Sequence, residues 1–138
     1  MLRNIIAIFV GLIVGMSANM AIIQFNMLVL FPIPEGVDFN DPAQLNAFMS
    51  TLPTGAFLMA MLAHLTQAFV GGWSAARLGA SHPIHLAGVI GVVSLAGGIS
   101  AMTMIDGPAW MIVELPLYLV LAWCAGKIEV NRRAKLNP

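Results

Sequence analysis

Three polar side chains lie inside long apolar segments of this sequence, where such groups are costly unless they are paired: Asn19, His64 and Glu114. A charged and unpaired Glu114 in lipid would be strongly unfavourable, so we expect it to be protonated or hydrogen-bonded. His64 is its expected partner, and the two can share a proton while Asn19 orients one of them. Gln67 and Tyr118 are predicted as further members of this intramembrane polar cluster.

The chemistry of the cluster leaves several interpretations open. Polar side chains cross-link membrane helices at about 0.6 kcal/mol on average, so a structural role competes with a proton or ligand site. A metal site is less favoured, because an Asn–His–Glu set lacks a third strong ligand for zinc. Serine-centred elbows, zinc-protease motifs and catalytic carboxylate pairs are absent from the sequence. We therefore predict no catalytic residue, no metal ion and no cofactor.

Four apolar segments must carry these side chains, and each is long enough to cross a hydrocarbon core, which takes about 20 helical residues. Of the 138 residues, 59% are hydrophobic and 9% are charged, whereas about a quarter of the residues of a soluble domain are charged. Only helices satisfy their own backbone hydrogen bonds in lipid, so we predict an all-α, four-helix transmembrane bundle forming one domain, 1–138. The predicted spans are 4–31, 53–78, 84–105 and 108–126, with an outer loop at 32–52 and a cytoplasmic tail at 127–138.

The distribution of charged residues predicts the orientation of the chain. All six basic residues can be placed on one side of the membrane, and four of the six acidic residues fall in the two opposite connections. Basic residues that flank membrane spans stay in the cytoplasm, so both termini are predicted to be cytoplasmic. The basic residues are Arg3, Arg77, Lys127, Arg132, Arg133 and Lys135, and the four acids are Glu35, Asp38, Asp41 and Asp106.

The outer loop contains the start signal of a short helix. Asp41 can cap it, Pro42 suits its first position, and Gln44 completes a capping-box pattern. Apolar residues follow at helical spacing, which predicts an amphipathic helix. Such a helix would lie on the outer membrane surface or form a lid on the end of the bundle, and both alternatives stay open.

Small residues recur at every fourth position in three of the spans, which predicts close helix packing. Each row also carries a member of the polar cluster: Asn19 continues the first row, His64 fills a gap in the second, and Glu114 and Tyr118 extend the row of the fourth. From the helical rise, we expect Asn19, His64 and Glu114 within about 5 Å of the middles of their spans. The predicted packing residues are Gly11, Gly15, Ala68, Gly72, Ala76, Ala122 and Gly126.

Scattered turn and packing motifs resemble those of an uncharacterised group of small bacterial membrane proteins with four predicted helices. The motifs are Pro34-x-Gly36-x-Asp38-x-x-Asp41-Pro42, Leu52-Pro53, His64, Gly71-Gly72, Ala75-Ala76, and Pro108 with Trp110. The resemblance covers most of the chain and implies a multi-pass protein of the bacterial inner membrane. Its motifs imply no mechanism, since no activity is established for the group.

Because small-residue rows outnumber chemically active residues, the first functional hypothesis is a non-enzymatic packing or accessory protein. It would act through helix contacts in the lipid membrane, as a homo-oligomer or as a small subunit of a larger membrane complex, with no nucleic-acid partner. The second hypothesis is a carrier or channel for protons or a small solute, with Asn19, His64 and Glu114 as its site. The third is a membrane enzyme that acts on a lipid or a quinone, with His64 as base and Tyr118 as donor.

Overall fold

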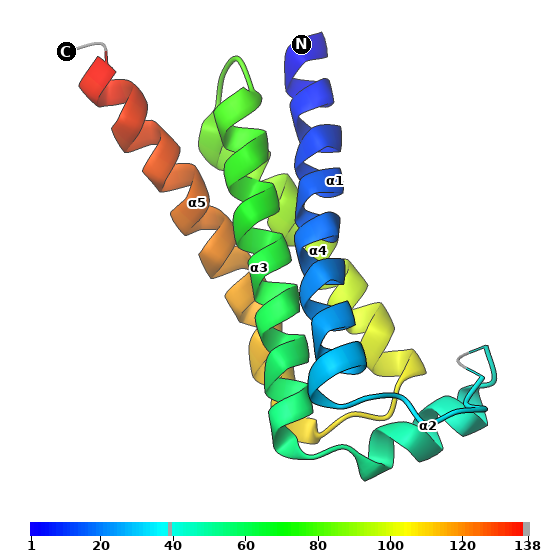
Figure 1. Cartoon of the computed structure of the whole chain (residues 1–138). Coiled ribbons are helices and arrows are strands. Elements are labelled where there is room, and N and C mark those ends of the chain that lie inside the picture. The colour runs from blue at the N-terminus through cyan, green and yellow to red at the C-terminus, as the bar shows by residue number, and fades with distance from the viewer. Residues whose placement is uncertain (39, 137–138) are drawn as a thin grey trace.

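The computed structural model describes residues 1–38 and 40–136 and places most of them in helices (Figure 1). Four helices are long: α1 (Leu2–Phe25), α3 (Thr54–Leu78), α4 (Pro83–Met104) and α5 (Glu114–Leu136). A π-helical turn, Asn26–Leu30, extends α1, and a 3-10 turn, Ala109–Val113, precedes α5. Four segments are long and apolar enough to cross a membrane, namely Leu2–Leu30, Thr54–Leu78, Pro83–Met104 and Ala109–Leu136. The prediction of an all-helical chain with four long apolar helices is confirmed.

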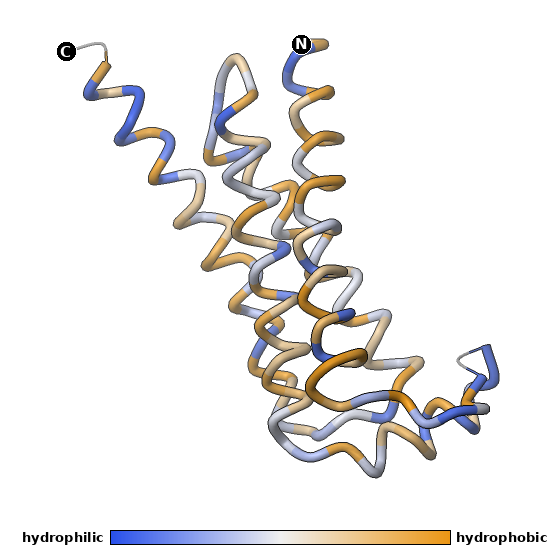
Figure 2. The backbone as a smooth tube through the Cα atoms, viewed as in Figure 1, coloured by the Kyte–Doolittle hydropathy of each residue, from blue (hydrophilic) through white to orange (hydrophobic). Residues whose placement is uncertain are grey.

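Helix α3 is the centre of the arrangement, because it packs against each of the other three long helices. Ala75 of α3 forms the core with Leu86 and Ile90 of α4, and Ile8 and Leu12 of α1 pack against this core. The start of α1 and the end of α5 lie at one end of the helices, and the α1–α3 and α4–α5 connections lie at the other (Figure 1). Hydrophilic residues gather at these two ends, whereas the lengths of the helices between them are mainly apolar (Figure 2).

The close approach of α1 and α3 depends on glycine. A Cβ atom on Gly11 would lie 2.7 Å from the carbonyl oxygen of Gly71, and one on Gly15 would lie 2.7 Å from the carbonyl oxygen of Gln67. On the other side of α3, Gly72 faces Ala122 of α5 and Ala87 of α4. All of the predicted packing residues are buried within this one chain: Gly11, Gly15, Ala68, Gly72, Ala76, Ala122 and Gly126. The small-residue rows therefore serve contacts inside the chain.

The last helix is longer than the predicted span. The sequence places the end of that span at Gly126, whereas α5 continues as a helix through Leu136. Glu129 forms ion pairs with Arg132 and Arg133 at helical spacings of three and four residues, and such pairs support the additional turns. Most of the segment predicted as a tail is thus helical, while residues 137–138 of that tail and residue 39 of the predicted outer loop lie outside the described residues.

The short helix predicted in the loop is present as α2 (Pro42–Thr51). The Asp41 carboxylate accepts a hydrogen bond from the Ala43 amide at 2.9 Å, as an N-cap does. Gln44 departs from the predicted capping box, because its side chain bonds the Asp41 carboxylate and the Asp38 amide instead of the Asp41 amide. The amide of Asp106 donates to the Asn46 side chain at 3.1 Å, and this bond joins α2 to the connection between α4 and α5. This bond and the buried Phe48 attach α2 to the rest of the chain, and both alternatives for α2, a membrane-surface helix and a lid, stay predictions.

Candidate functional site

His64 of α3 and Glu114 of α5 meet at the candidate site. The Nδ1 atom of His64 lies 3.2 Å from Oε1 and 3.3 Å from Oε2 of Glu114. The Tyr118 hydroxyl donates a 2.8 Å hydrogen bond to Oε1. Glu114 is only 2% exposed, whereas the His64 side chain is 27% exposed. The sequence-based pairing of His64 with Glu114 is therefore present, and Tyr118 completes a connected group.

Close packing of α4 against α5 places Tyr118 beside the glutamate. A Cβ atom on Gly98 of α4 would lie 2.7 Å from the Tyr118 ring, and one on Gly91 would lie 2.7 Å from the Ala122 side chain. Gly98 leaves room for the tyrosine ring, and Gly91 lets the two helices approach each other. Tyr118 follows Glu114 by four residues, so both side chains lie on one face of α5. The phenol can therefore hydrogen-bond the carboxyl group of the preceding turn.

A pocket of about 70 Å³ lies beside this group, lined by His64 and Gln67 of α3, Ser94, Gly98 and Ala101 of α4, and Tyr118 of α5. The buried hydroxyl oxygen of Ser94 has no hydrogen-bond partner among the described residues. The Nε2 atom of His64 likewise makes no hydrogen bond with any described residue. Polar groups without partners on the wall of a small pocket suit water or a molecule of similar size.

Asn19 and Gln67 form a separate pair. The Asn19 amide nitrogen donates a 2.7 Å hydrogen bond to Oε1 of Gln67. Gln67 lies one turn from His64 on α3 and also lines the pocket. The expectation that Asn19 orients His64 or Glu114 is wrong, because Gln67 takes its amide. The five predicted cluster residues thus form two groups, His64–Glu114–Tyr118 and Asn19–Gln67. Both groups contribute to the lining of the pocket.

His64 and Glu114 lie at different places along their helices. His64 lies near the middle of α3, as expected. Glu114, by contrast, is the first residue of α5 and follows directly on the 3-10 turn Ala109–Val113. The helical segment continues to Leu136, past the apolar stretch that ends near Gly126, and the depth of Glu114 in a membrane stays a prediction.

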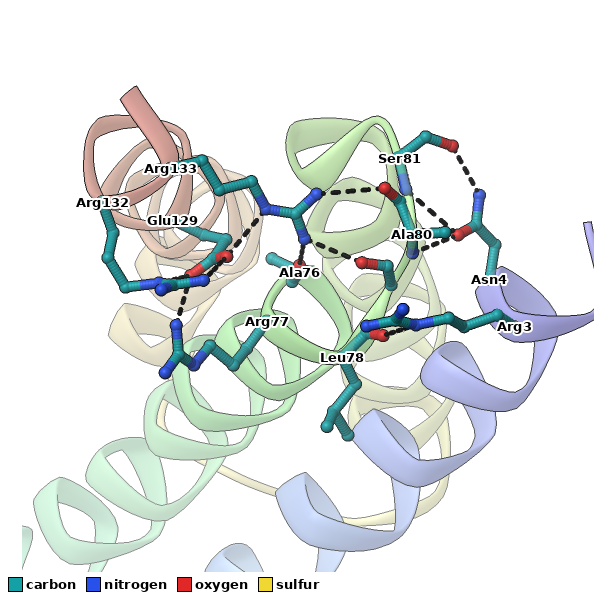
Figure 3. Close-up of polar contacts among 11 residues, drawn as sticks. Arg3, Asn4, Ala76, Arg77, Leu78, Ala80, Ser81, Glu129, Arg132 and Arg133 are labelled. Carbon is teal, nitrogen blue, oxygen red and sulfur yellow. Dashed lines mark hydrogen bonds and ion pairs between the residues drawn. The ribbon is translucent and has the colours of Figure 1, made fainter. Parts of the chain in front are cut away.

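A second buried carboxylate, Glu129, was missed by the sequence analysis. It is fully buried and accepts two 2.7 Å bonds from Arg132 and one 2.8 Å bond from Arg133. Arg77 of α3 is also paired with it, at 3.7 Å. The signal is the spacing Glu129-x-x-Arg132-Arg133, which lies in the segment predicted as a tail. Figure 3 shows the cluster of Glu129 with Arg77, Arg132 and Arg133 between α3 and α5.

The end of α3 beside this cluster is capped from both ends of the chain (Figure 3). Arg133 donates to the carbonyl oxygens of Ala76 at 2.7 Å and Gly79 at 2.8 Å. Arg3 donates to the carbonyl oxygen of Leu78 at 2.9 Å. The Asn4 side chain accepts a 2.8 Å bond from the Ala80 amide. The arginine bonds satisfy carbonyl groups that a helix C-terminus leaves without intrahelical partners, and all of these bonds tie the terminal helices to the α3–α4 turn.

The described residues contain no group of three or more histidine, cysteine, aspartate or glutamate side chains that could hold a metal ion. His64 and Glu114 offer two candidate ligands. Comparison of the chain with protein-family models, with curated proteins and with solved structures finds no match. The resemblance to small four-helix bacterial membrane proteins therefore stays a prediction.

Proposed function

We propose that this chain is an integral membrane protein in which the His64–Glu114–Tyr118 group takes up and releases a proton, as part of proton or small-solute transfer. The observation that carries the proposal is the contact of His64 Nδ1 with both oxygens of a nearly fully buried Glu114. Ionisable residues at such positions are costly in lipid and commonly mark ion or proton pathways. Between an imidazole and a carboxyl group, one proton can reside on either partner.

The surroundings of His64 supply an exchange route. One ring nitrogen is bound to Glu114, and the ring also lines the pocket that holds the Ser94 hydroxyl. An imidazole accepts a proton on one nitrogen and gives it up from the other, so a histidine between a carboxylate and water can act as a shuttle. Tyr118 keeps one oxygen of Glu114 occupied as an acceptor and so orients the carboxyl group toward His64.

The size of the pocket limits what can be transferred. Its volume of about 70 Å³ has room for a few water molecules, since a cavity needs about 10 to 15 Å³ of this kind to hold one. Sites for larger organic ligands typically measure about 300 Å³ or more. A proton, or a solute of the size of water, therefore fits better than a quinone ring, and the membrane-enzyme alternative has the least support.

Proton flux in reconstituted liposomes tests the proposal. A pH-sensitive dye inside the vesicles reports proton entry when a potassium diffusion potential is applied. We expect wild-type flux above that of protein-free liposomes and a fall to that background in Glu114→Gln, which keeps the shape of the side chain but removes its acid. Glu35→Gln, a change of the same type at an exposed residue, should leave flux unchanged. Equal flux in wild type and Glu114→Gln would refute the proposal.

For the orientation, we propose a bacterial inner-membrane protein with both termini in the cytoplasm. The support is the basic end of the molecule, where Arg3, Arg77, Arg132 and Arg133 surround the α3–α4 turn, because basic residues are retained on the cytoplasmic side. Fusion of a fluorescent protein to the C-terminus should give fluorescent cells, whereas an alkaline phosphatase fusion at the same place should be inactive. An active phosphatase fusion would reverse the topology.

A packing or accessory role is the second candidate, and α1 is the observation that favours it. Its buried residues, Ala7, Gly11 and Gly15, face α3, while large apolar side chains such as Phe9 and Ile13 are exposed on its other sides. A helix of a second copy or a larger complex can pack there. Native mass spectrometry of the detergent-solubilised protein separates the candidates. A stable oligomer that Phe9→Ala dissociates favours the accessory role, and a monomer with proton flux favours the first.

A further inference from the structure

Arg77 is the member of the Glu129 cluster that makes an ion pair but no hydrogen bond with the described residues. Its guanidinium lies 3.7 Å from Glu129 Oε2, close enough for an ion pair and too far for a hydrogen bond. It donates no hydrogen bond to the described part of the chain, although a guanidinium has five N–H donors. The Arg77 side chain is 42% exposed. Its donors therefore remain available to an outside acceptor.

The cluster as a whole has more positive than negative charge. Three guanidinium groups share the single carboxylate of Glu129, which leaves two positive charges without a counterion in the cluster. Arg133 directs its donors to Glu129 and to the backbone carbonyls of the α3–α4 turn. Arg132 is 37% exposed, and its Nη1 group makes no hydrogen bond among the described residues. An anionic group beside Arg77 and Arg132 would balance the remaining positive charge of the cluster.

Tryptophan side chains locate this site relative to a membrane. Trp73 lies one turn before Arg77 on α3 and is 41% exposed. Trp123 of α5 is 51% exposed and makes a cation–π contact with the Lys127 ammonium, which lies 5.6 Å from the ring centroid. Tryptophan favours the level of the lipid headgroups, and basic residues favour the same region. The two exposed arginines are therefore placed at the depth of lipid phosphate groups.

We propose that Arg77 and Arg132 bind the phosphate group of an anionic phospholipid between this end of α3 and α5. Guanidinium forks match the oxygen geometry of phosphate, and basic pockets between transmembrane helices bind anionic headgroups. The acyl chains of the lipid would lie along the exposed apolar surface below the tryptophans. Bound in this way, the lipid supplies the charge that Glu129 alone does not balance and joins the two helices. The site is separate from the His64–Glu114 group.

Native mass spectrometry with defined lipids tests this site. The detergent-solubilised full chain is titrated with phosphatidylglycerol or with phosphatidylcholine of the same acyl chains. We expect tighter retention of phosphatidylglycerol and about fivefold weaker affinity for it in Arg77→Gln, because one direct hydrogen bond contributes about that factor. Arg77→Gln leaves the three hydrogen bonds of Glu129 from Arg132 and Arg133 in place, so the variant should fold. Lys135→Gln, the same charge change at an exposed residue of α5, should bind like wild type.

The outcomes separate the alternatives. Equal phosphatidylglycerol affinity in wild type and Arg77→Gln would overturn the site, and so would equal retention of phosphatidylcholine and phosphatidylglycerol. Inorganic phosphate is added in a second arm, with the thermal unfolding midpoint as readout. Stabilisation by inorganic phosphate as large as that by the lipid, and lost in Arg77→Gln, would overturn the lipid assignment in favour of free phosphate. Stabilisation by phosphatidylglycerol alone supports the proposal.

Discussion

Glu114 and Glu129 lie on the same face of α5, about four turns and 22 Å apart, and both are almost completely buried. Their partners differ in kind. Glu114 is paired with His64, an imidazole that can bind or release a proton, and with the neutral hydroxyl of Tyr118. Glu129 is paired with three permanently charged arginines. The first arrangement suits proton exchange and the second suits a fixed structural and lipid-facing junction. The two glutamates should therefore respond differently to the same substitution.

Glu129→Gln should destabilise the protein strongly. The change removes the acceptor charge between three partly exposed guanidinium groups, and a hydrogen bond to a charged group contributes about 1.5 to 3 kcal/mol. The free energy of unfolding in detergent micelles, followed by circular dichroism during chemical denaturation, measures the loss. Glu35→Gln is the control, because Glu35 is exposed and its substitution should be nearly neutral. Similar stability of the two variants would contradict the structural role of Glu129.

Tyr118→Phe should lower the free energy of unfolding by about 1 to 3 kcal/mol, because Glu114 loses one hydrogen bond in a buried setting. A double-mutant cycle with Glu114→Met isolates this interaction. In the Glu114→Met background, Tyr118→Phe should cost much less than in wild type. An equal cost in both backgrounds would show that the hydroxyl acts elsewhere than on Glu114.

Gly11→Ala should loosen α1 from α3. The added methyl group would lie 2.7 Å from the Gly71 carbonyl oxygen and 2.8 Å from the Ala75 side chain, and such overpacking costs about 1 to 3 kcal/mol. Gly88→Ala is the matched control, since a Cβ atom there meets nothing within 4 Å. That variant should be neutral or gain up to about 1 kcal/mol from the higher helix propensity of alanine. Thermal unfolding in one detergent should give a lower midpoint for Gly11→Ala than for Gly88→Ala. Equal midpoints would contradict the prediction.

The N-terminus of α2 should lose stability in acid. Hydrogen bonds from the Gln44 side chain and the Ala43 amide lower the pKa of Asp41 below its usual value of 3.8. Because the pKa is lower in the folded state, the stabilisation is complete above the unfolded pKa and disappears as the pH falls through the folded pKa. Hydrogen exchange of the Ala43 amide should therefore accelerate in that acid range. In Asp41→Asn, which still caps a helix, the acid-dependent acceleration should vanish, and its persistence would assign the effect to another group.

The number, type and approximate limits of the long helices could be predicted from the sequence. Hydropathy over about 20 residues and turn residues such as Pro32, Pro83 and Pro108 act locally, so they carry this information without any tertiary contact. The rows that contain His64, Glu114 and Tyr118 were equally readable, because helical spacing places the small and polar residues of a row on one face.

Partner choice was decided only by the tertiary structure. Asn19 bonds Gln67 because the close contact of Gly15 with the Gln67 backbone brings those two turns together. The helical spacing of residues in α1 and in α3 does not determine how the two helices are rotated relative to each other. Glu129 becomes a buried centre only because α5 continues beyond Gly126 and Arg77 reaches it from α3. Such contacts arise between segments far apart in the chain, where packing rather than local spacing determines which side chains meet.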